Sequence, residues 1–547
     1  MYFEPHHHDF VDFASTAPGA DPEQVVVAGA GPVGLAVALG LARRGVTVTV
    51  LEAGDSVCHG SRAICLSRHS MEVLDRIGVG GEFTRRSLPW TTGRSHYRDT
   101  EVLAFAMPHG ETDVREPMAN ISQSVAEQIL LDAALAEPRI KLRWKSRITG
   151  VTQDDGQVTV EAETPAGPRV LRARHLVACD GAHSAVRKAL DVHLEGTSYE
   201  GRYVIADIHW ESELPTERQA WFDPPSNPGQ TILLHRQPDD IWRIDYQIDA
   251  DEDPEEAIRE ENVRAVITRH LEWLGTRKPW TLEWSSLYRA HARALGSFLH
   301  GRVLFAGDAA HLVPIFGVRG LNSGLEDADV YAWALAAVVN GGADERILRT
   351  VADERRDAWR QNAEQAEKST LFMTPGTDGY RLTRDAILQL ALARPVLRHL
   401  INPRQSNATH SRTSPLTHTA TPAASGPLPG DPLPDLKVTP AGGEGTGLHA
   451  LRGATFSLIA AATAADAARV ASELSAFLPV TALATEGEPA DGVPVLGHET
   501  AAHLGLTEGE ALLVRPDGLV LARIRTDEPL GPLTRHLTDQ LTAGGAR

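Results

Sequence analysis

One short segment constrains this chain more than any other: Gly29–Gly34, which reads Gly-Ala-Gly-Pro-Val-Gly. It follows an apolar run, Val25–Ala28, and precedes a helix-like run, Leu35–Arg44, after which comes a β-branched stretch, Val46–Leu51. This order predicts a strand–helix–strand unit whose glycines permit a tight turn, close helix packing and close approach to a pyrophosphate at the helix N-terminus. The residues expected to bind a dinucleotide are Gly29, Ala30, Gly31, Pro32, Val33 and Gly34.

Glu52 ends the second predicted strand, 18 positions beyond Gly34. A carboxylate at this point accepts hydrogen bonds from both hydroxyls of an adenosine ribose and repels a 2′-phosphate. We therefore expect Glu52 to bind the ribose of the dinucleotide.

Two further motifs follow predicted strands. Cys179–Arg187 reads Cys-Asp-Gly-Ala-His-Ser-Ala-Val-Arg, and Gly307–Pro314 reads Gly-Asp-Ala-Ala-His-Leu-Val-Pro. With the glycine-rich turn, these motifs resemble in order those of the group A FAD-dependent aromatic hydroxylases, the family of p-hydroxybenzoate hydroxylase and phenol hydroxylase. The resemblance covers about residues 22–400 and implies that the dinucleotide is FAD.

The resemblance also implies roles for single residues. Asp308, which follows Gly307, would bind a ribityl hydroxyl of FAD, and Asp180 would serve both FAD and a passing nicotinamide dinucleotide. Arg62 and Gln123 match positions that touch the flavin and the ribityl chain.

A third segment, Phe316–Gly324, leads into a long predicted helix and resembles the family segment beside the isoalloxazine ring. Backbone N–H groups of Gly320, Leu321 and Asn322 at that helix N-terminus would stabilise the negative charge of reduced flavin. Pro314 would place its carbonyl near the reacting edge, and Arg319 would keep a positive charge close to it.

The implied reaction needs few catalytic side chains, because the flavin supplies the chemistry. NADH or NADPH would reduce FAD, and O2 would form a C4a-hydroperoxide that hydroxylates a phenolic or other aromatic small molecule. Another FAD oxidoreductase of this fold, such as an epoxidase or a reductase, and a non-catalytic flavin-binding scaffold remain open alternatives. A flavin halogenase is disfavoured, because its W-x-W-x-I-P segment is not present.

The stretch from about residue 202 to residue 288 is mostly extended and predicts an antiparallel sheet that lines the substrate pocket. Alternation places Trp242, Ile244 and Tyr246 on one face, which we expect to contact the substrate ring. Candidates for the base that removes a phenolic proton include His235 and Tyr246. Arg236 falls near the position of a carboxylate-binding arginine of the family, so an acidic substrate stays an open question.

The fold is therefore expected to be α/β, with a Rossmann-like FAD-binding domain (22–200 and 291–400), an antiparallel-sheet substrate domain (201–290), a Pro- and Gly-rich linker (401–447) and a C-terminal domain (448–547). The C-terminal domain resembles the thioredoxin-like domain of phenol hydroxylase but contains no cysteine, which excludes disulfide exchange there. The resemblance also suggests a homodimer.

Composition narrows the partners. A net charge of −19 disfavours nucleic acid and anionic membranes, which need clustered Lys and Arg. No signal peptide or uninterrupted apolar span is present and only three cysteines occur, so a cytoplasmic protein is expected. We expect no metal site, and we interpret His6–His8 as part of a disordered tail, since nothing nearby completes a coordination shell.

Overall fold

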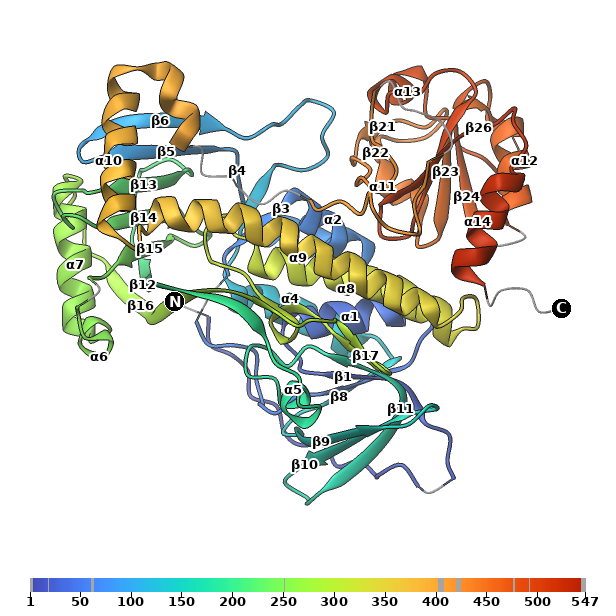
Figure 1. Ribbon diagram of the computed structural model, residues 1–547, viewed down its shortest axis with the longest axis horizontal. Helices are drawn as coiled ribbons and strands as arrows, with labels where there is room; N and C mark the ends of the chain where they lie inside the picture. The colour runs from blue at the N-terminus through green and yellow to red at the C-terminus, as the bar shows by residue number, and fades with distance from the viewer. Residues whose placement is uncertain are drawn as a thin grey trace.

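The computed structural model describes residues 3–17, 19–60, 63–249, 251–401, 408–419, 425–475, 478–490 and 492–542. Three large sheets organise these residues (Figure 1). In Figure 1 the C-terminal sheet lies at upper right, the middle sheet at left, and the first sheet below and between them.

The first sheet has the strand order β17-β18-β11-β1-β2-β8, with β9 and β10 as an antiparallel extension of β11. Its strands are β1 (Glu23–Ala28), β2 (Val48–Leu51), β8 (Ile140–Arg143), β9 (Arg147–Gln153), β10 (Val158–Glu163), β11 (Arg169–Ala178), β17 (Leu299–His300) and β18 (Val303–Phe305). The five strands from β18 to β8 are parallel. β1, β2 and β18 are short apolar runs because helices and loops bury them on both sides.

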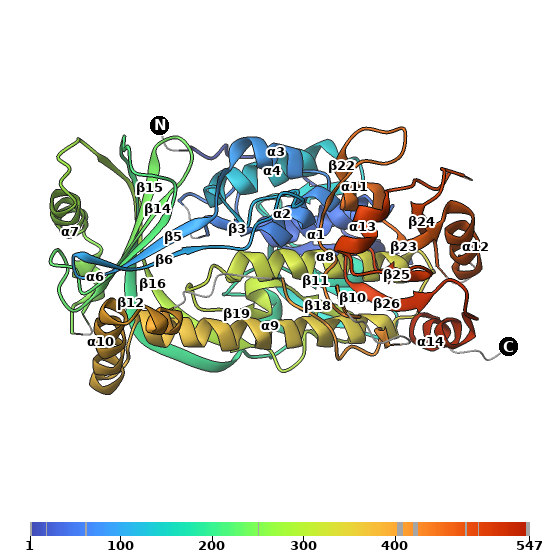
Figure 2. The same ribbon diagram turned by 90° about the horizontal axis from the view of Figure 1, so that it is seen from above.

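The helices of this part are α1 (Pro32–Ala42), α2 (Arg68–Arg76), α3 (Gly80–Arg86), α4 (Gln123–Ala136), α5 (Ala185–Ala189), α8 (Gly320–Val339) and α9 (Arg346–Met373). Helix α1 packs between α4 and α8. Strands β3 (Cys65–Ser67), β7 (Met118–Asn120) and β4 (Leu88–Trp90) form a small sheet. In the chain, β3 precedes α2, and β4 follows α3. Helix α9 extends from the middle sheet to the C-terminal sheet, as both views show (Figure 2).

The middle sheet has the order β19-β16-β12-β15-β14-β13-β5-β6. Its strands are β5 (Thr92–Tyr97), β6 (Thr100–Ala106), β12 (Glu195–His209), β13 (Arg218–Phe222), β14 (Thr231–Arg236), β15 (Ile241–Gln247), β16 (Thr281–Ala294) and β19 (His311–Leu312). The predicted antiparallel block is present, and β5 and β6 join it from about 90 residues earlier in the chain. Helices α6 (Pro254–Ala257), α7 (Glu260–Trp273) and α10 (Asp378–Ala393) and the 3-10 helix η2 (Pro395–Ile401) complete this region.

The prediction of which face of this sheet lines the substrate pocket is wrong. Trp242, Ile244 and Tyr246 do share a face, but they pack with Val263 and Ile267 of α7 in one buried apolar cluster. The alternation was predicted correctly, yet the helix that covers this face comes from a later segment, so alternation alone could not tell which face it would cover.

The C-terminal sheet has the order β20-β26-β25-β23-β24. Its elements are β20 (His418–Thr419), β23 (Phe456–Thr463), α12 (Ala464–Leu474), β24 (Val480–Glu486), α13 (His498–His503), β25 (Glu510–Val514), β26 (Val520–Arg525) and α14 (Gly531–Leu541), preceded by β21 (Lys437–Val438), β22 (Thr446–Gly447) and α11 (Leu448–Arg452). Of the expected linker, residues 402–407 and 420–424 lie outside the described residues. Its described parts pack closely, with Leu416 and Leu433 buried.

The N-terminal segment differs from the expected disordered tail. Residues 3–17 run along the first sheet, where the Thr16 N–H donates to the Val170 carbonyl at 2.9 Å and Arg169 Nε donates to the Phe13 carbonyl at 2.7 Å. The His8 ring stacks on Trp144, with ring centroids 4.7 Å apart. Composition could not reveal these contacts, because the partners lie more than 100 residues away. Within the described ranges, no helix is long and apolar enough to cross a membrane.

Candidate active site

Three strand ends meet at one edge of the first sheet. Ala28 of β1 pairs with Ala178 of β11, which pairs with Phe305 of β18. The three sequence motifs begin immediately after these residues, so the sheet brings together Gly29, the Asp180 loop and the Gly307 loop, which are far apart in the chain.

The glycines of the first motif are required by backbone crowding. Gly29 has φ +94°, and a Cβ there would lie 2.6 Å from the Cys179 carbonyl oxygen. A Cβ on Gly34 would lie 2.0 Å from the Gly29 carbonyl oxygen. Val33 fills the space that Gly307 leaves, since a Cβ on Gly307 would come within 3.0 Å of it. The turn is therefore held between the other two motifs.

Gly31 is different, because it faces open space. It caps α1, no side chain bonds to the first turn, and nothing lies within 4 Å of a Cβ built on it. Nearby, Asp180 Oδ1 is buried without a hydrogen-bond partner among the described residues. An uncapped helix N-terminus beside an open backbone position fits the pyrophosphate of FAD.

Glu52, the residue expected to bind the ribose, lies beside the glycine turn. Its carboxylate accepts the Ala30 N–H at 2.8 Å and the Gly54 N–H at 2.7 Å, which fixes its orientation beside the glycine turn. The N-terminal arm reaches the same corner, where His7 Nδ1 lies 2.9 Å from the Asp55 carboxylate.

Arg187 joins the second and third motifs. Its guanidinium donates to the carbonyl of Gly181 at 3.1 Å and, across the gap, to the carbonyls of Asp308 at 3.3 Å and Ala309 at 2.9 Å. Asp308 itself, in the 3-10 helix η1 (Gly307–Ala309), is exposed. In the sequence, Arg187 was only the last residue of the second motif and was given no role. Its position at the end of a loop motif was the available signal that it connects two motifs.

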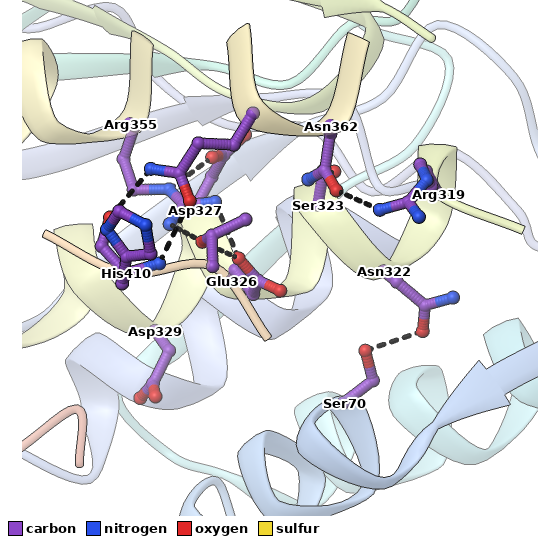
Figure 3. A network of polar contacts seen from close by, with 12 residues as sticks. Ser70, Arg319, Asn322, Ser323, Glu326, Asp327, Asp329, Arg355, Asn362 and His410 are labelled. Carbon is purple, nitrogen blue, oxygen red and sulfur yellow. Dashed lines mark hydrogen bonds and ion pairs between the residues drawn. The ribbon is translucent and has the colours of Figure 1, made fainter. Parts of the chain in front are cut away.

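The N-terminus of α8 forms the other end of the site. No side chain caps this 20-residue helix, its first turn has no acidic residue, and nothing lies within 4 Å of a Cβ on Gly320. Asn322 anchors it by accepting the Ser67 N–H at 2.9 Å and the Ser70 hydroxyl at 2.6 Å, a contact drawn in Figure 3. Pro314 is buried, and Leu321 is partly exposed. The open helix end suits the negative charge of a reduced flavin.

Arg319, the residue that precedes α8, is 4% exposed. Its guanidinium donates to the Asn362 side chain of α9 at 2.7 Å, and Asn362 donates to the Ser323 hydroxyl at 2.8 Å (Figure 3). Gln123, at the start of α4, accepts the Ala63 N–H at 3.0 Å and donates to Glu127 at 2.8 Å. The expected flavin contact Arg62 lies outside the described residues.

A buried ionic network holds α8 against α9 and against the third motif. Arg355 of α9 donates to Asp327 at 2.7 Å and to Glu326 at 3.0 Å (Figure 3). Asp327 also accepts the Gly307 N–H at 3.0 Å and lies 2.7 Å from His311 Nε2. Burial alone would raise the pKa of Asp327, but His311 and Arg355 hold it to about 2. Asp327 is thus a permanent anion that fixes Gly307 relative to α8.

The face of the middle sheet opposite α7 carries buried polar groups. Asp207 pairs in register with Arg243, which pairs with His235 on the next strand. Arg243 donates to both oxygens of Asp207, at 2.8 and 2.9 Å. Tyr203, on the same face, packs against Phe316 with ring centroids 5.2 Å apart. This face therefore looks toward the loop that precedes α8.

Two titratable groups on this face are shifted in opposite ways. Burial raises the pKa of Asp245 to about 7, and Asp207 adds to the shift while Arg243 opposes it. Burial, with Arg218 and Arg243 nearby, holds the pKa of His235 well below its ordinary value. His235 is thus uncharged near neutral pH, whereas Asp245 titrates there. Sequence reasoning missed Asp245, although charged residues that alternate with Trp242, Ile244 and Tyr246 were the available signal. It also missed Arg218, which lies on a different strand, β13.

Tyr246 points to the α7 side of the sheet, where its hydroxyl is buried and burial raises its pKa. Arg236 also lies on that side, over the Trp242 ring at 5.4 Å. Tyr246 and Arg236, which were expected from the sequence to lie near the substrate, are thus on the side of the sheet away from Phe316.

A cavity of about 150 Å³ opens beside Phe316. Its lining includes four phenylalanines, Phe105, Phe222, Phe316 and Phe372, and the side chain of Arg218. A wider groove of about 990 Å³ shares Phe105 with it and extends past Ser67 and Arg319. Aromatic walls next to the open end of α8 suit a planar ring held beside a flavin.

Comparisons with known proteins agree with this geometry. Residues 23–366 match the family described as FAD binding domain, and residues 426–543 match the family described as aromatic-ring hydroxylase, C-terminal. The chain is 30% identical to para-nitrophenol 4-monooxygenase of Pseudomonas sp. (strain WBC-3) over 67% of this chain and 91% of that protein. It is 29% identical to 3-(3-hydroxy-phenyl)propionate/3-hydroxycinnamic acid hydroxylase of Mycolicibacterium smegmatis over 70% of this chain and 67% of that protein. The solved structure of the flavin-dependent monooxygenase PieE, in complex with FAD and substrate, shares the fold, with a TM-score of 0.80, 22% identity and coverage of 95% of this chain and 99% of that chain.

Proposed function

This chain belongs to the FAD-dependent aromatic hydroxylases, and we propose that it uses NADH or NADPH together with O2 to hydroxylate a phenolic small molecule. It is an FAD-dependent monooxygenase of aromatic compounds. The observation that carries the proposal is the open N-terminus of α8, a helix that lies against Val33 of the glycine turn at Gly324 and whose preceding loop packs on Tyr203 of the polar face through Phe316.

FAD supplies electron transfer and oxygen activation when it is bound, and the protein positions it. The turn Gly29–Gly34 would hold the pyrophosphate, Glu52 would bind the adenosine ribose, and Asp308 would bind the ribityl chain. Asp180 contributes its unpartnered oxygen at the same edge. The described contact of Gln123 with the Ala63 N–H supports a role in shaping the loop against the ribityl chain.

Around the flavin ring, the backbone N–H groups of Gly320, Leu321 and Asn322 would stabilise negative charge on the reduced ring, and Pro314 would offer its carbonyl to it. Arg319 acts through Asn362, which holds the guanidinium under the first turn of α8. Because the polar face of the middle sheet is buried, water is kept from the substrate, which limits wasteful formation of hydrogen peroxide.

Asp245 is a better proton acceptor for a phenol than His235 or Tyr246. A base works best when its pKa lies near the working pH, and Asp245 has a pKa of about 7. His235 instead has a strongly lowered pKa, so it holds a proton poorly and serves as a neutral hydrogen-bonding group.

The domain organisation expected from sequence supports this function. Residues 22–200 and 291–400 form the FAD-binding domain, 201–290 with β5 and β6 the substrate domain, 401–447 the connection, and 448–547 a thioredoxin-like domain. The order β26-β25-β23-β24, with α12 between the parallel strands β23 and β24, supports the last assignment. A homodimer in the cytoplasm, where NADH and NADPH are available, completes the proposal.

The test is NADH and NADPH oxidation by the FAD-loaded protein with a panel of phenols, while O2 uptake, hydrogen peroxide and products are followed. We expect at least one phenol to accelerate oxidation and to give a hydroxylated product with little peroxide. A flavin-binding scaffold would bind FAD but show no phenol-dependent oxidation. An epoxidase or a reductase would consume NADH or NADPH without a ring-hydroxylated product.

A further inference from the structure

The large apolar side chains that this protein exposes are concentrated on one helix and the segment that follows it. Ten such side chains occur among the described residues, and α10 and η2 carry five of them: Tyr380, Leu382, Leu390, Val396 and Leu400. Figure 1 and Figure 2 both show α10 at the end of the molecule away from the C-terminal sheet. Single exposed apolar residues are ordinary, but a group of them on one surface marks an interaction site.

Helix α10 has two faces of different character. Its inner face is buried, where Leu388 and Ala391 join the apolar cluster that contains Phe316. Its outer face carries Leu382, which is 65% exposed, and Leu390, which is 52% exposed. The inner face explains how the helix is held on the molecule, so the outer leucines have a different role.

The outer face has a regular order of residues. Asp378, Leu382, Ala386, Leu390 and Arg394 are all exposed and follow one another at intervals of four positions. Residues four apart on a helix form one continuous ridge, and we call these five residues the α10 ridge. From Ala386 outward, the ridge has a leucine on each side and then opposite charges at its two ends.

A ridge with this order is complementary to a second copy of itself. When two helices pack through ridges of this spacing, which is the commonest arrangement in globular proteins, the ridges lie side by side. A two-fold axis at Ala386 makes the two ridges antiparallel. Leu382 of one protomer then meets Leu390 of its partner, and Asp378 meets Arg394. The small side chain of Ala386 at the axis lets the two helices approach closely.

The charges select this antiparallel direction. Asp378 is exposed and pairs only at the surface, with Arg381 at 2.8 Å, and Arg394 is exposed at the other end of the helix. The exposed residues that flank the ridge between these two ends on the same face are uncharged: Gly379, Thr383, Gln389 and Ala393. A parallel pair of helices would set like charges against each other at both ends, whereas the antiparallel pair sets opposite charges together.

The apolar surface continues beyond the helix. A stable interface buries about 600 Å² or more on each partner, which is more than one narrow ridge supplies. The 3-10 helix η2 packs against α10, and its Val396 is 75% exposed and its Leu400 47% exposed. These two side chains enlarge the surface that a second copy would cover.

We propose that two copies of this chain form a two-fold symmetric dimer through the α10 ridge, with Ala386 at the axis. This inference rests on the homodimer of the proposed function and adds the surface that forms it. The buried leucines supply affinity, and the two pairs of Asp378 with Arg394 fix the direction of the helices.

The first experiment measures the mass of the FAD-loaded protein by analytical ultracentrifugation over a range of concentrations. We expect the wild type to be a dimer. Leu390→Arg should weaken association by about 100-fold or more, because it buries a cation against the partner's apolar side chains. The matched control is Leu135→Arg, which changes a leucine of similar exposure, 54%, near the end of α4 and should leave the dimer intact.

A charge exchange tests the pairing directly. Asp378→Arg and Arg394→Asp each set like charges against each other at both ends, so each should weaken the dimer by about 10-fold or more. The double variant restores opposite charges and should recover most of the affinity. Both changes also oppose the dipole of α10, and this effect is larger in the double variant, so recovery requires the contact between protomers.

The outcomes separate the two levels of the account. A wild type that is monomeric at every concentration would overturn both the homodimer and this inference. A dimer that persists in Leu390→Arg would overturn the α10 surface and leave the homodimer standing. A double charge variant that associates no better than the single variants would overturn the antiparallel pairing. The charge variants alter only exposed groups, so the test stays decisive even when Leu390→Arg fails to fold.

Discussion

Gly31 and Gly34 are two glycines of one turn that the structure needs for different reasons. A Cβ on Gly34 would meet the Gly29 carbonyl at 2.0 Å, whereas a Cβ on Gly31 would meet no protein atom within 4 Å. Gly34 therefore serves the fold, and Gly31 leaves room for the dinucleotide. Their sequence spacing is the same in any glycine-rich turn, so only the folded backbone separates the two roles.

We therefore expect Gly34→Ala to lower the melting temperature of the FAD-free protein. Gly31→Ala should leave that temperature unchanged and weaken FAD binding by about 10-fold or more, because one lost phosphate contact is worth ~1.5 kcal/mol or more. Thermal denaturation without FAD and titration with FAD measure the two effects. Unchanged FAD affinity in Gly31→Ala would show that the pyrophosphate lies elsewhere.

Asp245 should set the pH dependence of catalysis. Its pKa of about 7 means that it accepts a proton only above that pH, so the specificity constant should rise as pH increases through about 7. Asp245→Asn should remove this rise and lower the rate at least about 100-fold. The measurement is kcat/KM against pH with the best phenol. A rise near the same pH in the variant would assign the base to another group.

The raised pKa of Asp245 also predicts that this residue makes the folded protein less stable as pH rises. Between the ordinary pKa of an aspartate and about 7, the unfolded chain loses the proton that folded Asp245 keeps, so this residue increasingly favours unfolding as pH rises. Asp245→Asn should therefore melt at a higher temperature than the wild type at about pH 8 and at the same temperature near pH 4. A variant that is less stable at both pH values would mean that Asp245 is ionised and paired in the folded protein.

At the scale of elements, the turn between β25 and β26 locks the C-terminal sheet onto the helices of the active site. Arg515 bonds to Glu354 of α9 at 2.8 and 2.9 Å, and Asp517 accepts the Trp333 indole N–H of α8 at 2.7 Å. All four residues are buried. Helix α8, whose N-terminus we propose to lie beside the flavin, is thus fixed at Trp333 by the last part of the chain.

Arg515→Met should destabilise the protein by about 3–5 kcal/mol, because Glu354 and Asp517 would stay buried without their cation. The matched control is Arg525→Met, which breaks an exposed pair with Asp527 and should change stability by less than about 1 kcal/mol. Chemical denaturation measures both. Equal small losses in the two variants would show that the turn does not hold α8 and α9.

Helices and strands could be predicted from the sequence where the residue pattern that defines them is local. The strand–helix–strand unit around Gly29–Gly34 and the helix after Gly320 occur as expected. The predicted orientation of β15 was wrong, because Trp242, Ile244 and Tyr246 face α7. Both faces of this sheet are covered by segments from elsewhere in the chain, and alternation within one strand cannot tell which cover contains the active site.

At the scale of the whole molecule, long-range contacts assemble the site. Three strand ends from residues 28, 178 and 305 meet, α9 spans from the middle sheet to the C-terminal sheet, and residues 3–17 close one corner. The cofactor side of this arrangement could be predicted, because its three motifs are each continuous in sequence. The polar face of the middle sheet could not, because Arg218 and Asp245 belong to separate strands and only the sheet register brings them to the same face as His235, which the sequence did indicate.

The central claim is that this fold holds FAD and an aromatic substrate so that one atom of O2 is transferred to the ring. The most direct test is turnover with NADH or NADPH under isotope-labelled O2 in ordinary water, followed by mass spectrometry of the product. The account predicts one labelled oxygen atom in the new hydroxyl group and an unlabelled product when only the water is labelled. A product whose new oxygen comes from water would contradict it.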